Sequence, residues 1–162
     1  MSLNKRLMSS APPPFVASGN FGILTWTGNN SNSRAITGLG FKPDWVWIKR
    51  RNSSEPHAVY DSTRGPNKQL EANDTDAEAT NSGDYLGLPS FDSDGFTVGN
   101  NGGTNRSGNT YVAWCWKVGG GTTSSNTDGA NITSTVQTNT DAGISIVKWT
   151  GDGHASSTVG MD

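Results

Sequence analysis

Three stretches of the chain concentrate apolar residues in the manner of β-strands. They are FGILTWT (21–27), DWVWIKR (44–50) and TYVAWCWK (110–117). Each is rich in β-branched and aromatic residues and is bounded by Gly, Asn or Pro, which is typical of strands. Weaker strand patterns are HAVYD (57–61), NKQL (67–70) and GFTV (95–98). Many short strands with no convincing helix predict an all-β protein built as a sandwich or barrel.

The segments between these strands are made of turn-forming residues. The turn clusters are TGNNSNS, GLGFKP, FDSDGF and GNNGGTNRSGN. Gly, Ser, Thr and Asn make up close to half of the chain, and only 31% of residues are hydrophobic. That composition favours turns and half-buried strands over helices. Six Trp, five Phe and three Tyr still supply enough large apolar surface for a compact core.

Composition divides the chain into four parts. Residues 1–17 form a Pro-rich arm, and residues 18–118 are expected to form the β-sandwich domain. Residues 119–142 are a connector of Gly, Ser, Thr and Asn that we expect to be flexible, because it has little apolar surface to bury. A short strand, ITSTV, is expected to interrupt it. Residues 143–162 are interpreted as the start of a second, truncated copy of the domain.

The interpretation as a repeat depends on two similar stretches, FGILTWTGNNS near the start and ISIVKWTGDGH near the end. Aligning Trp26 with Trp149 also aligns Gly28 with Gly151 and places Ile36 on Val159. The two Trp are separated by about one domain length, as expected for an internal repeat. The other interpretation is that apolar-Trp-Thr-Gly, a strand that leads into a turn, arose twice. A repeat predicts that the chain is the N-terminal part of a longer protein.

The arm has two interpretations. It contains a basic pair, an apolar pair and three consecutive prolines that stiffen the chain and give it no sheet partner. It is either a disordered leader or a docking arm that becomes ordered on a partner. The residues of the candidate anchor are Lys5, Arg6, Leu7, Met8, Pro12, Pro13, Pro14 and Phe15.

Charge and cysteine content exclude several classes of protein. The formal net charge is −2 and the 12 Lys and Arg are scattered, which argues against a nucleic-acid surface. One cysteine, Cys115, allows no internal disulfide and no cysteine-rich metal site. No apolar run approaches the length of a membrane span, and the first ten residues lack the apolar core of a signal peptide. We expect no metal and no cofactor.

Candidate catalytic groups each have a structural alternative. His57 and Asp61 are four residues apart in HAVYD, and an even separation places both side chains on the same face of a strand. There they would act either as a general base and the carboxylate that orients it or as partners in a structural hydrogen bond. Asp92 and Asp94 in FDSDGF, or Glu78, could serve glycoside hydrolysis. Asp-x-Asp-Gly is equally the pattern of a tight turn. Cys115 lies in an apolar strand, where we expect an inert core thiol. No catalytic residue is therefore assigned.

The tryptophans offer a second kind of candidate site. Trp45 and Trp47 share one face of their predicted strand, and Trp114 and Trp116 share one face of theirs. Strands that are apolar on both faces suggest central positions covered on both sides. These four indoles either pack in a core or, if exposed, form a platform for sugar rings.

The ordered series of motifs resembles a domain of virion proteins of marine tailed phages, especially those of cyanophages. In that family a YTGNG-like turn is followed by GFxPDxVWIK, HxxxDxxRG, a Thr-x-Ala-Glu loop, FxxxGF and YVAWxWK. The resemblance covers roughly residues 18–160. The matching positions are Gly28, Gly40, Phe41, Pro43, Asp44, Val46, Trp47, Ile48, Lys49, His57, Asp61, Arg64, Gly65, Ala77, Glu78, Phe91, Gly95, Phe96 and Tyr111 to Trp114.

The resemblance implies a concanavalin A-like jelly-roll β-sandwich and a structural role in the virion, assembled in the host cytoplasm. We expect a tail-fibre, tail-associated or head-decoration component, bound by its arm to other virion proteins, oligomeric, and in contact with host-surface polysaccharide. It implies no enzymatic residues. His57, Asp61, Arg64 and Gly65 are expected to form a structural corner, in which Asp61 accepts a charge-assisted hydrogen bond from Arg64. The alternatives are a lectin-like adhesin and, less favoured, a glycan depolymerase.

Overall fold

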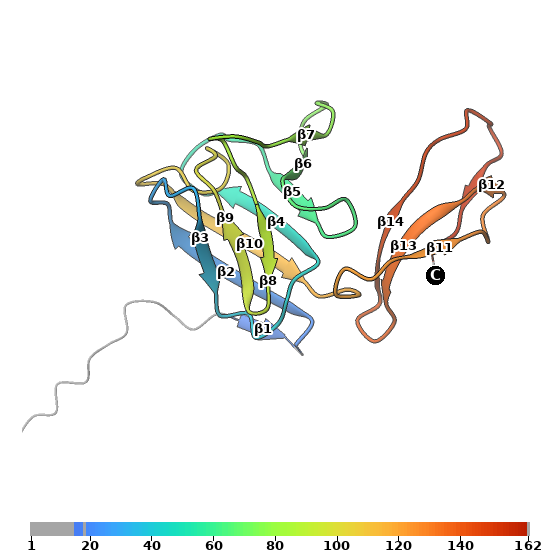
Figure 1. Cartoon of the computed structure of the whole chain (residues 1–162), viewed down its shortest axis with the longest axis horizontal. Coiled ribbons are helices and arrows are strands. Elements are labelled where there is room, and N and C mark those ends of the chain that lie inside the picture. Colours follow the sequence, from blue (N-terminus) through green and yellow to red (C-terminus); the bar gives the residue numbers. More distant parts are fainter. Residues whose placement is uncertain (1–14, 18, 162) are drawn as a thin grey trace, which may run out of the picture.

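The computed structural model describes residues 15–17 and 19–161, and this part of the chain is all-β with no α-helix (Figure 1). The predicted all-β class is confirmed. In the described residues there is consequently no helix of the length and apolarity needed to cross a membrane. The arm residues Lys5, Arg6, Leu7, Met8, Pro12, Pro13 and Pro14 lie outside the described residues.

One sheet of seven strands dominates the molecule, and we call it the large sheet. Its order is β1-β2-β10-β4-β5-β6-β7, and all neighbouring strands are antiparallel. Its strands are β1 (Phe15–Ala17), β2 (Phe21–Thr27), β10 (Thr110–Trp116), β4 (Trp45–Arg50), β5 (Ala58–Asp61), β6 (Lys68–Glu71) and β7 (Ala79–Thr80). β10 is therefore inserted between two strands that precede it in sequence by more than half of the domain. The three strongest sequence patterns form the centre of this sheet.

A second antiparallel sheet, the small sheet, has the order β3-β9-β8. Its strands are β3 (Arg34–Thr37), β9 (Gly95–Val98) and β8 (Ser90–Asp92). The buried core contains side chains from both sheets, including Leu24 and Val46 of the large sheet and Ile36 and Phe96 of the small one. Two sheets with one shared core are consistent with the predicted β-sandwich, and we call this part the sandwich.

Trp26 shows how the core is organised. Its ring stacks on Tyr111 with centroids 5.4 Å apart and meets Phe96 edge-on at 5.8 Å. Its indole Nε1 donates a hydrogen bond to the carbonyl of Thr104 at 3.0 Å, so the polar group of this buried side chain is satisfied. Cys115 is a buried free thiol, as predicted, and burial raises its pKa.

Strand alternation gives the large sheet two different faces. On β10, Tyr111, Ala113 and Cys115 point into the core, whereas Val112, Trp114 and Trp116 lie half-buried on the opposite face. We call this opposite side the outer face. The sequence prediction that β10 is covered on both sides is thus only partly met.

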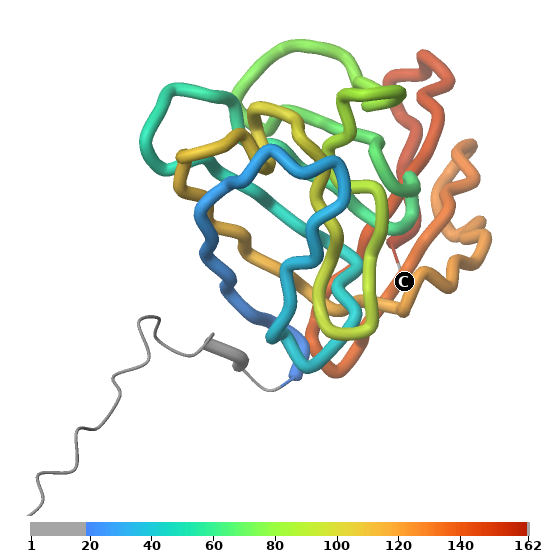
Figure 2. Tube along the Cα trace, turned by 60° about the vertical axis from the view of Figure 1, so that its left-hand side comes forward, coloured from blue at the N-terminus to red at the C-terminus, as the bar shows by residue number. Residues whose placement is uncertain are grey.

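Residues 124–159 form a separate group of strands, the C-terminal unit, which lies beside the sandwich (Figures 1 and 2). One antiparallel sheet has the order β11-β13-β14, and β12 pairs with β15 in parallel. The strands are β11 (Ser124–Asn126), β12 (Asn131–Ile132), β13 (Ser134–Asn139), β14 (Ile144–Lys148) and β15 (Thr158–Val159).

The strands extend beyond the boundaries expected from composition. Three of them lie within residues 119–142, the expected connector, which is ordered by hydrogen bonds rather than by extensive apolar burial. At the other end, β1 lies within the expected arm, and its backbone pairs with β2, with Phe15 opposite Ile23. The sheet thus begins before residue 18.

The hairpin β13–β14 is paired like the hairpin β1–β2. Phe15 and Ala17 lie opposite Ile23 and Phe21, and Gln137 and Asn139 lie opposite Ile146 and Ile144. In the sequence alignment Ile146 corresponds to Ile23, so each aligned strand is the second strand of an antiparallel hairpin. The pairing of the two segments is alike, but Trp26 is 8% exposed and Trp149 is 53% exposed.

Candidate functional site

The four predicted indoles lie together on the outer face of the large sheet. Trp45 and Trp47 come from β4, and Trp114 and Trp116 come from β10, directly opposite them in the register Trp47–Trp114 and Trp45–Trp116. The rings of Trp47 and Trp114 meet edge-on at 6.0 Å. All four side chains are half-buried, so they are neither core residues nor fully exposed.

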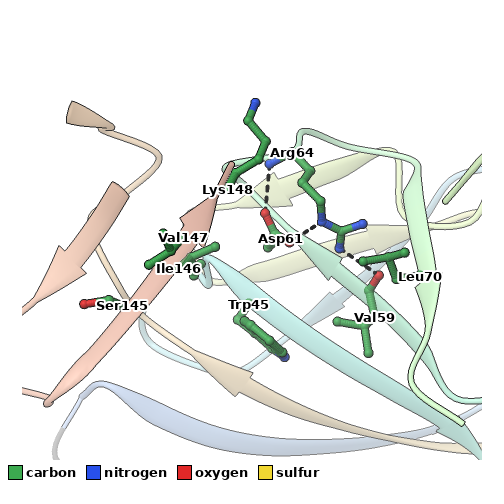
Figure 3. Close-up of a pocket in the computed structure, with 9 residues that line it drawn as sticks. All are labelled: Trp45, Val59, Asp61, Arg64, Leu70, Ser145, Ile146, Val147 and Lys148. Carbon is green, nitrogen blue, oxygen red and sulfur yellow. Dashed lines mark hydrogen bonds and ion pairs between the residues drawn. The ribbon is translucent and has the colours of Figure 1, made fainter. Parts of the chain in front are cut away.

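A groove of about 400 Å³ separates these indoles from the C-terminal unit. Trp45, Trp47 and Trp116 form one wall, and Ile144 at the start of β14 forms the other. A second hollow of about 210 Å³ continues along β14 (Figure 3). Its lining residues are Trp45, Val59, Asp61, Arg64, Leu70, Ser145, Ile146, Val147 and Lys148. The outer face is therefore the surface on which β14 lies, and Ile146 is buried there.

The polar atoms of the indoles differ in their partners. Nε1 of Trp47 donates a hydrogen bond to Nδ1 of His57 at 2.9 Å, which requires that nitrogen to be unprotonated. Burial, and secondarily the nearby charge of Lys49, lower the pKa of His57. Nε1 of Trp45 is buried without a hydrogen-bond partner among the described residues. That Nε1 atom is covered by protein atoms, so the wall of the groove is mainly aromatic carbon.

The predicted structural corner forms without His57. The Asp61 carboxylate accepts hydrogen bonds from the backbone N–H of Arg64 at 2.8 Å and from its Nε at 2.5 Å (Figure 3). Gly65 closes the turn with a hydrogen bond to the Asp61 carbonyl and a φ of 102°, which favours glycine. Arg64 also forms an ion pair with Glu78 at 3.1 Å. His57 instead lies beside Trp47, because it precedes β5 and its ring turns to the outer face.

The acidic residues of FDSDGF lie in a hairpin turn between β8 and β9. Asp94 accepts hydrogen bonds from the backbone N–H groups of Gly38 and Gly40, at 3.1 and 2.6 Å. Asp92 accepts from the hydroxyls of Ser90 and Thr97, each at 2.8 Å. Asp94 therefore holds the loop of Gly38 and Gly40, and Asp92 bonds within the β8–β9 hairpin, as the turn interpretation expects. Within the described residues no group of three or more His, Cys, Asp or Glu is arranged to hold a metal ion.

A buried polar junction joins the sandwich to the C-terminal unit. Asp44 is fully buried, and its carboxylate accepts hydrogen bonds from the backbone N–H of Val118 at 2.7 Å and of Gly120 at 2.9 Å. The hydroxyl of Ser62 donates to the same carboxylate at 2.8 Å. A buried carboxylate without an ion pair is costly unless hydrogen bonds replace its water, and here three of them do so.

Gln137 of β13 completes this junction from the other side. Its side-chain oxygen accepts hydrogen bonds from the N–H groups of Gly119 at 2.8 Å and Gly121 at 3.0 Å. Its side-chain nitrogen donates to the hydroxyls of Ser62 and Thr63, both at 2.9 Å. Asp44 and Gln137 therefore both bind the backbone of residues 118–121. Since Gln137 also bonds to Ser62 and Thr63, the C-terminal unit is fixed to the sandwich by side-chain hydrogen bonds and not only by the connecting chain.

Sequence reasoning missed this junction. Asp44 carries a signal, since an acidic residue directly before an apolar strand is expected either to cap a turn or to be buried with partners. Gln137 has no comparable signal, because it lies among Ser, Thr and Asn in a segment with no apolar pattern.

These features define an all-β protein whose sandwich and C-terminal unit are joined by buried hydrogen bonds. A family model described as "Domain of unknown function (DUF7483)" matches residues 17–162, and the chain belongs to this family. Comparison with curated proteins and with solved structures gave no significant match.

Proposed function

We propose that this protein is a virion structural protein that displays its sandwich outward from the phage particle. The resemblance of its ordered motifs to virion domains motivates the proposal, and a concanavalin A-like jelly roll is the fold it implies. The observation that carries it is the junction of Asp44 and Gln137. A display protein has to hold successive units in a set geometry. Here Gln137 of the C-terminal unit makes four hydrogen bonds, to Ser62 and Thr63 of the sandwich and to Gly119 and Gly121, beside the three that Asp44 accepts.

The proposed anchor is the arm before β1, bound to other virion proteins in a symmetric assembly. Because β1 pairs with β2 at the edge of the large sheet, removal of residues 1–14 leaves that edge strand in place. A shortened chain without residues 1–14 should fold like the full chain and be absent from purified particles. Mass spectrometry of particles, with a melting curve of the free protein, tests this. Normal incorporation of the shortened chain would contradict the anchor.

A lectin-like adhesin is the second candidate, favoured by the half-buried indoles that line the groove beside β14. Flat aromatic faces can stack on the apolar side of sugar rings. Trp116→Ala should reduce binding to host-surface polysaccharide on a glycan array, and a melting curve reports separately the stability lost with its ring contact to Phe21. Trp149→Ala, which removes an exposed indole outside the groove, is the matched control. Equal binding by both variants and the unaltered chain would exclude this groove.

A further inference from the structure

A third hollow, of about 250 Å³, lies between loops at one end of the sandwich. Asn30, Tyr85, Asn100 and Arg106 line it. Asn30 and Arg106 belong to loops that follow β2 and precede β10, at the end of the large sheet where Thr27 pairs with Thr110. The C-terminal unit is joined at the opposite end, after Trp116. We call this hollow the end pocket; it is thus separate from both the groove and the junction.

Asn105 fixes two of the loops to each other. It is fully buried, and its side-chain nitrogen donates to the Asn29 side-chain oxygen and to the Ser31 carbonyl, both at 3.0 Å. Its own carbonyl accepts a hydrogen bond from the N–H of Asn30 at 2.8 Å. Asn30 adopts a left-handed φ of 61°, which Asn tolerates better than most residues. The position of Asn30 is therefore set by a buried polar network.

The third loop is tied in by its backbone. The N–H of Gly99 donates to the Gly87 carbonyl at 3.0 Å, and the N–H of Asn101 donates to the Leu86 carbonyl at 3.1 Å. A Cβ at Gly99 would lie 2.4 Å from atoms of Leu86, so the two segments are in direct contact. These bonds hold the residues on either side of Asn100 against the residues that follow Tyr85. The end pocket is consequently pre-organised, so little conformational entropy of the loops is lost when a ligand binds.

The groups that line the end pocket are not used elsewhere in the fold. Tyr85 is 57% exposed, one of few large apolar side chains in the described part that are so exposed. Among the described residues the guanidinium of Arg106 makes no hydrogen bond or ion pair. The side-chain oxygen of Asn100 is buried and has no hydrogen-bond partner there. A rigid scaffold therefore presents an aromatic ring, a cation and the exposed side chain of Asn30, whereas the Asn100 oxygen is covered by protein atoms.

We propose that the end pocket binds a saccharide unit that carries an acidic group. The ring of Tyr85 suits the apolar face of a sugar, and the exposed amide of Asn30 suits its hydroxyls. The free guanidinium of Arg106 suits a carboxylate or sulfate. The volume lies below the roughly 300–1,000 Å³ of pockets for drug-sized ligands, so it suits one sugar residue or a chain end.

The end pocket and the groove differ in the chemistry of their walls. The groove presents mainly aromatic and aliphatic carbon. The end pocket presents three uncharged polar groups and a cation. A sugar needs several hydrogen bonds to replace its water, and the end pocket supplies more of them. This inference concerns the isolated chain and holds whether or not the protein is part of a virion.

Titration calorimetry of the full chain with tetragalacturonate, with its methyl ester and with a sulfated galactan tetrasaccharide tests the proposal. We expect at least one of the two acidic oligosaccharides to bind and the neutral ester to bind at least about tenfold more weakly. Binding should also weaken with added salt, since a charge contributes to it. Failure of both acidic oligosaccharides to bind at millimolar concentration, or equal binding of the ester, would overturn the proposal.

Variants locate the site. Arg106→Gln and Tyr85→Ala should each weaken binding about tenfold or more, and both should melt like the unaltered chain because these side chains are exposed. Trp149→Ala, which removes an exposed side chain outside the end pocket, should bind normally. Loss of binding in Trp116→Ala with normal binding in Arg106→Gln would place the saccharide in the groove and overturn the assignment to the end pocket.

Discussion

The strand FGILTWT and its counterpart ISIVKWT have similar sequences and equivalent hairpin partners, yet they bury opposite faces. In β2, Leu24 and Trp26 are buried in the core and Ile23 on the outer face is half-buried. In β14, Ile146, the counterpart of Ile23, is buried against the sandwich, whereas Trp149 follows the last residue of the strand and is exposed. The same local pattern therefore produces a strand in both places, but the strands differ in length and in environment.

The difference lies in residues far away in the sequence. Tyr111 stacks on Trp26, the Thr104 carbonyl accepts from its indole, and the N–H of Gly28 donates to the Asn109 carbonyl at 2.7 Å. Trp149 and Gly151 have no equivalent neighbours among the described residues. Local sequence sets the strand and its turn, and later segments decide which side chains are buried.

Replacement of the two tryptophans gives the largest expected contrast. Trp26→Ala should lower the free energy of unfolding by about 3–5 kcal/mol, because it leaves a cavity under Tyr111 and Phe96. Trp149→Ala should change it by no more than about 0.5 kcal/mol, as for an exposed side chain. Denaturant unfolding of both variants measures this. Similar losses for the two would show that Trp149 is packed in solution.

The two glycines that follow these tryptophans give the next contrast. A Cβ at Gly28 would lie 2.2 Å from the Arg106 carbonyl oxygen, whereas a Cβ at Gly151 meets nothing within 4 Å. Gly28→Ala should therefore destabilise the protein by about 1–3 kcal/mol through overpacking. Gly151→Ala should be neutral or stabilise by up to about 1 kcal/mol. Thermal melting distinguishes them, and a neutral Gly28→Ala would mean that the loop yields easily.

Gln137→Ala tests whether the two regions are fixed to each other. It leaves the N–H groups of Gly119 and Gly121 without their acceptor, at a cost of about 1–3 kcal/mol for a buried group. We expect faster hydrogen exchange in β13 and β14, with little change in β2, β10 and β4. Thr138→Ala, which removes the hydroxyl that accepts a hydrogen bond from the Ser145 hydroxyl across the hairpin, is the control. Unchanged exchange in Gln137→Ala would show that the junction does not fix the unit.

The smallest expected effect is a pH dependence that belongs to the sandwich. The pKa of His57 is lowered by burial, so folding favours the neutral ring that accepts the hydrogen bond from Trp47. The contribution of His57 to the free energy of unfolding is complete above the unfolded-state pKa of about 6.5, and it is lost as the pH falls through the lower folded-state pKa. Urea unfolding between pH 7.5 and 5 should show the decrease, and His57→Gln should flatten it. An equal decrease in His57→Gln would assign it to other groups.

Sequence patterns predicted the central strands, the buried thiol of Cys115 and the contact between Asp61 and Arg64, because each depends on neighbours along the chain. They failed where a contact joins distant segments. His57 is not part of the predicted corner, because its ring accepts a hydrogen bond from Trp47 on the neighbouring strand β4. Gln137 ordered a segment with a flexible composition because its partners, Ser62 and Thr63, lie in the sandwich. The end pocket was missed because its four residues come from three loops that are far apart in the sequence.

The insertion of β10 between β2 and β4 bears on how the chain folds during synthesis. β2 and β4 emerge early, and each lacks its main neighbour until residues 110–116 leave the ribosome. Until then the strand edges of β2 and β4 that will pair with β10 have no partner, and the aromatic residues of β4 can associate with other chains. Folding is also expected to be slow for a domain of this size, since its central pairings are long-range. A pause in translation before β10 should therefore increase aggregation more than a pause after it.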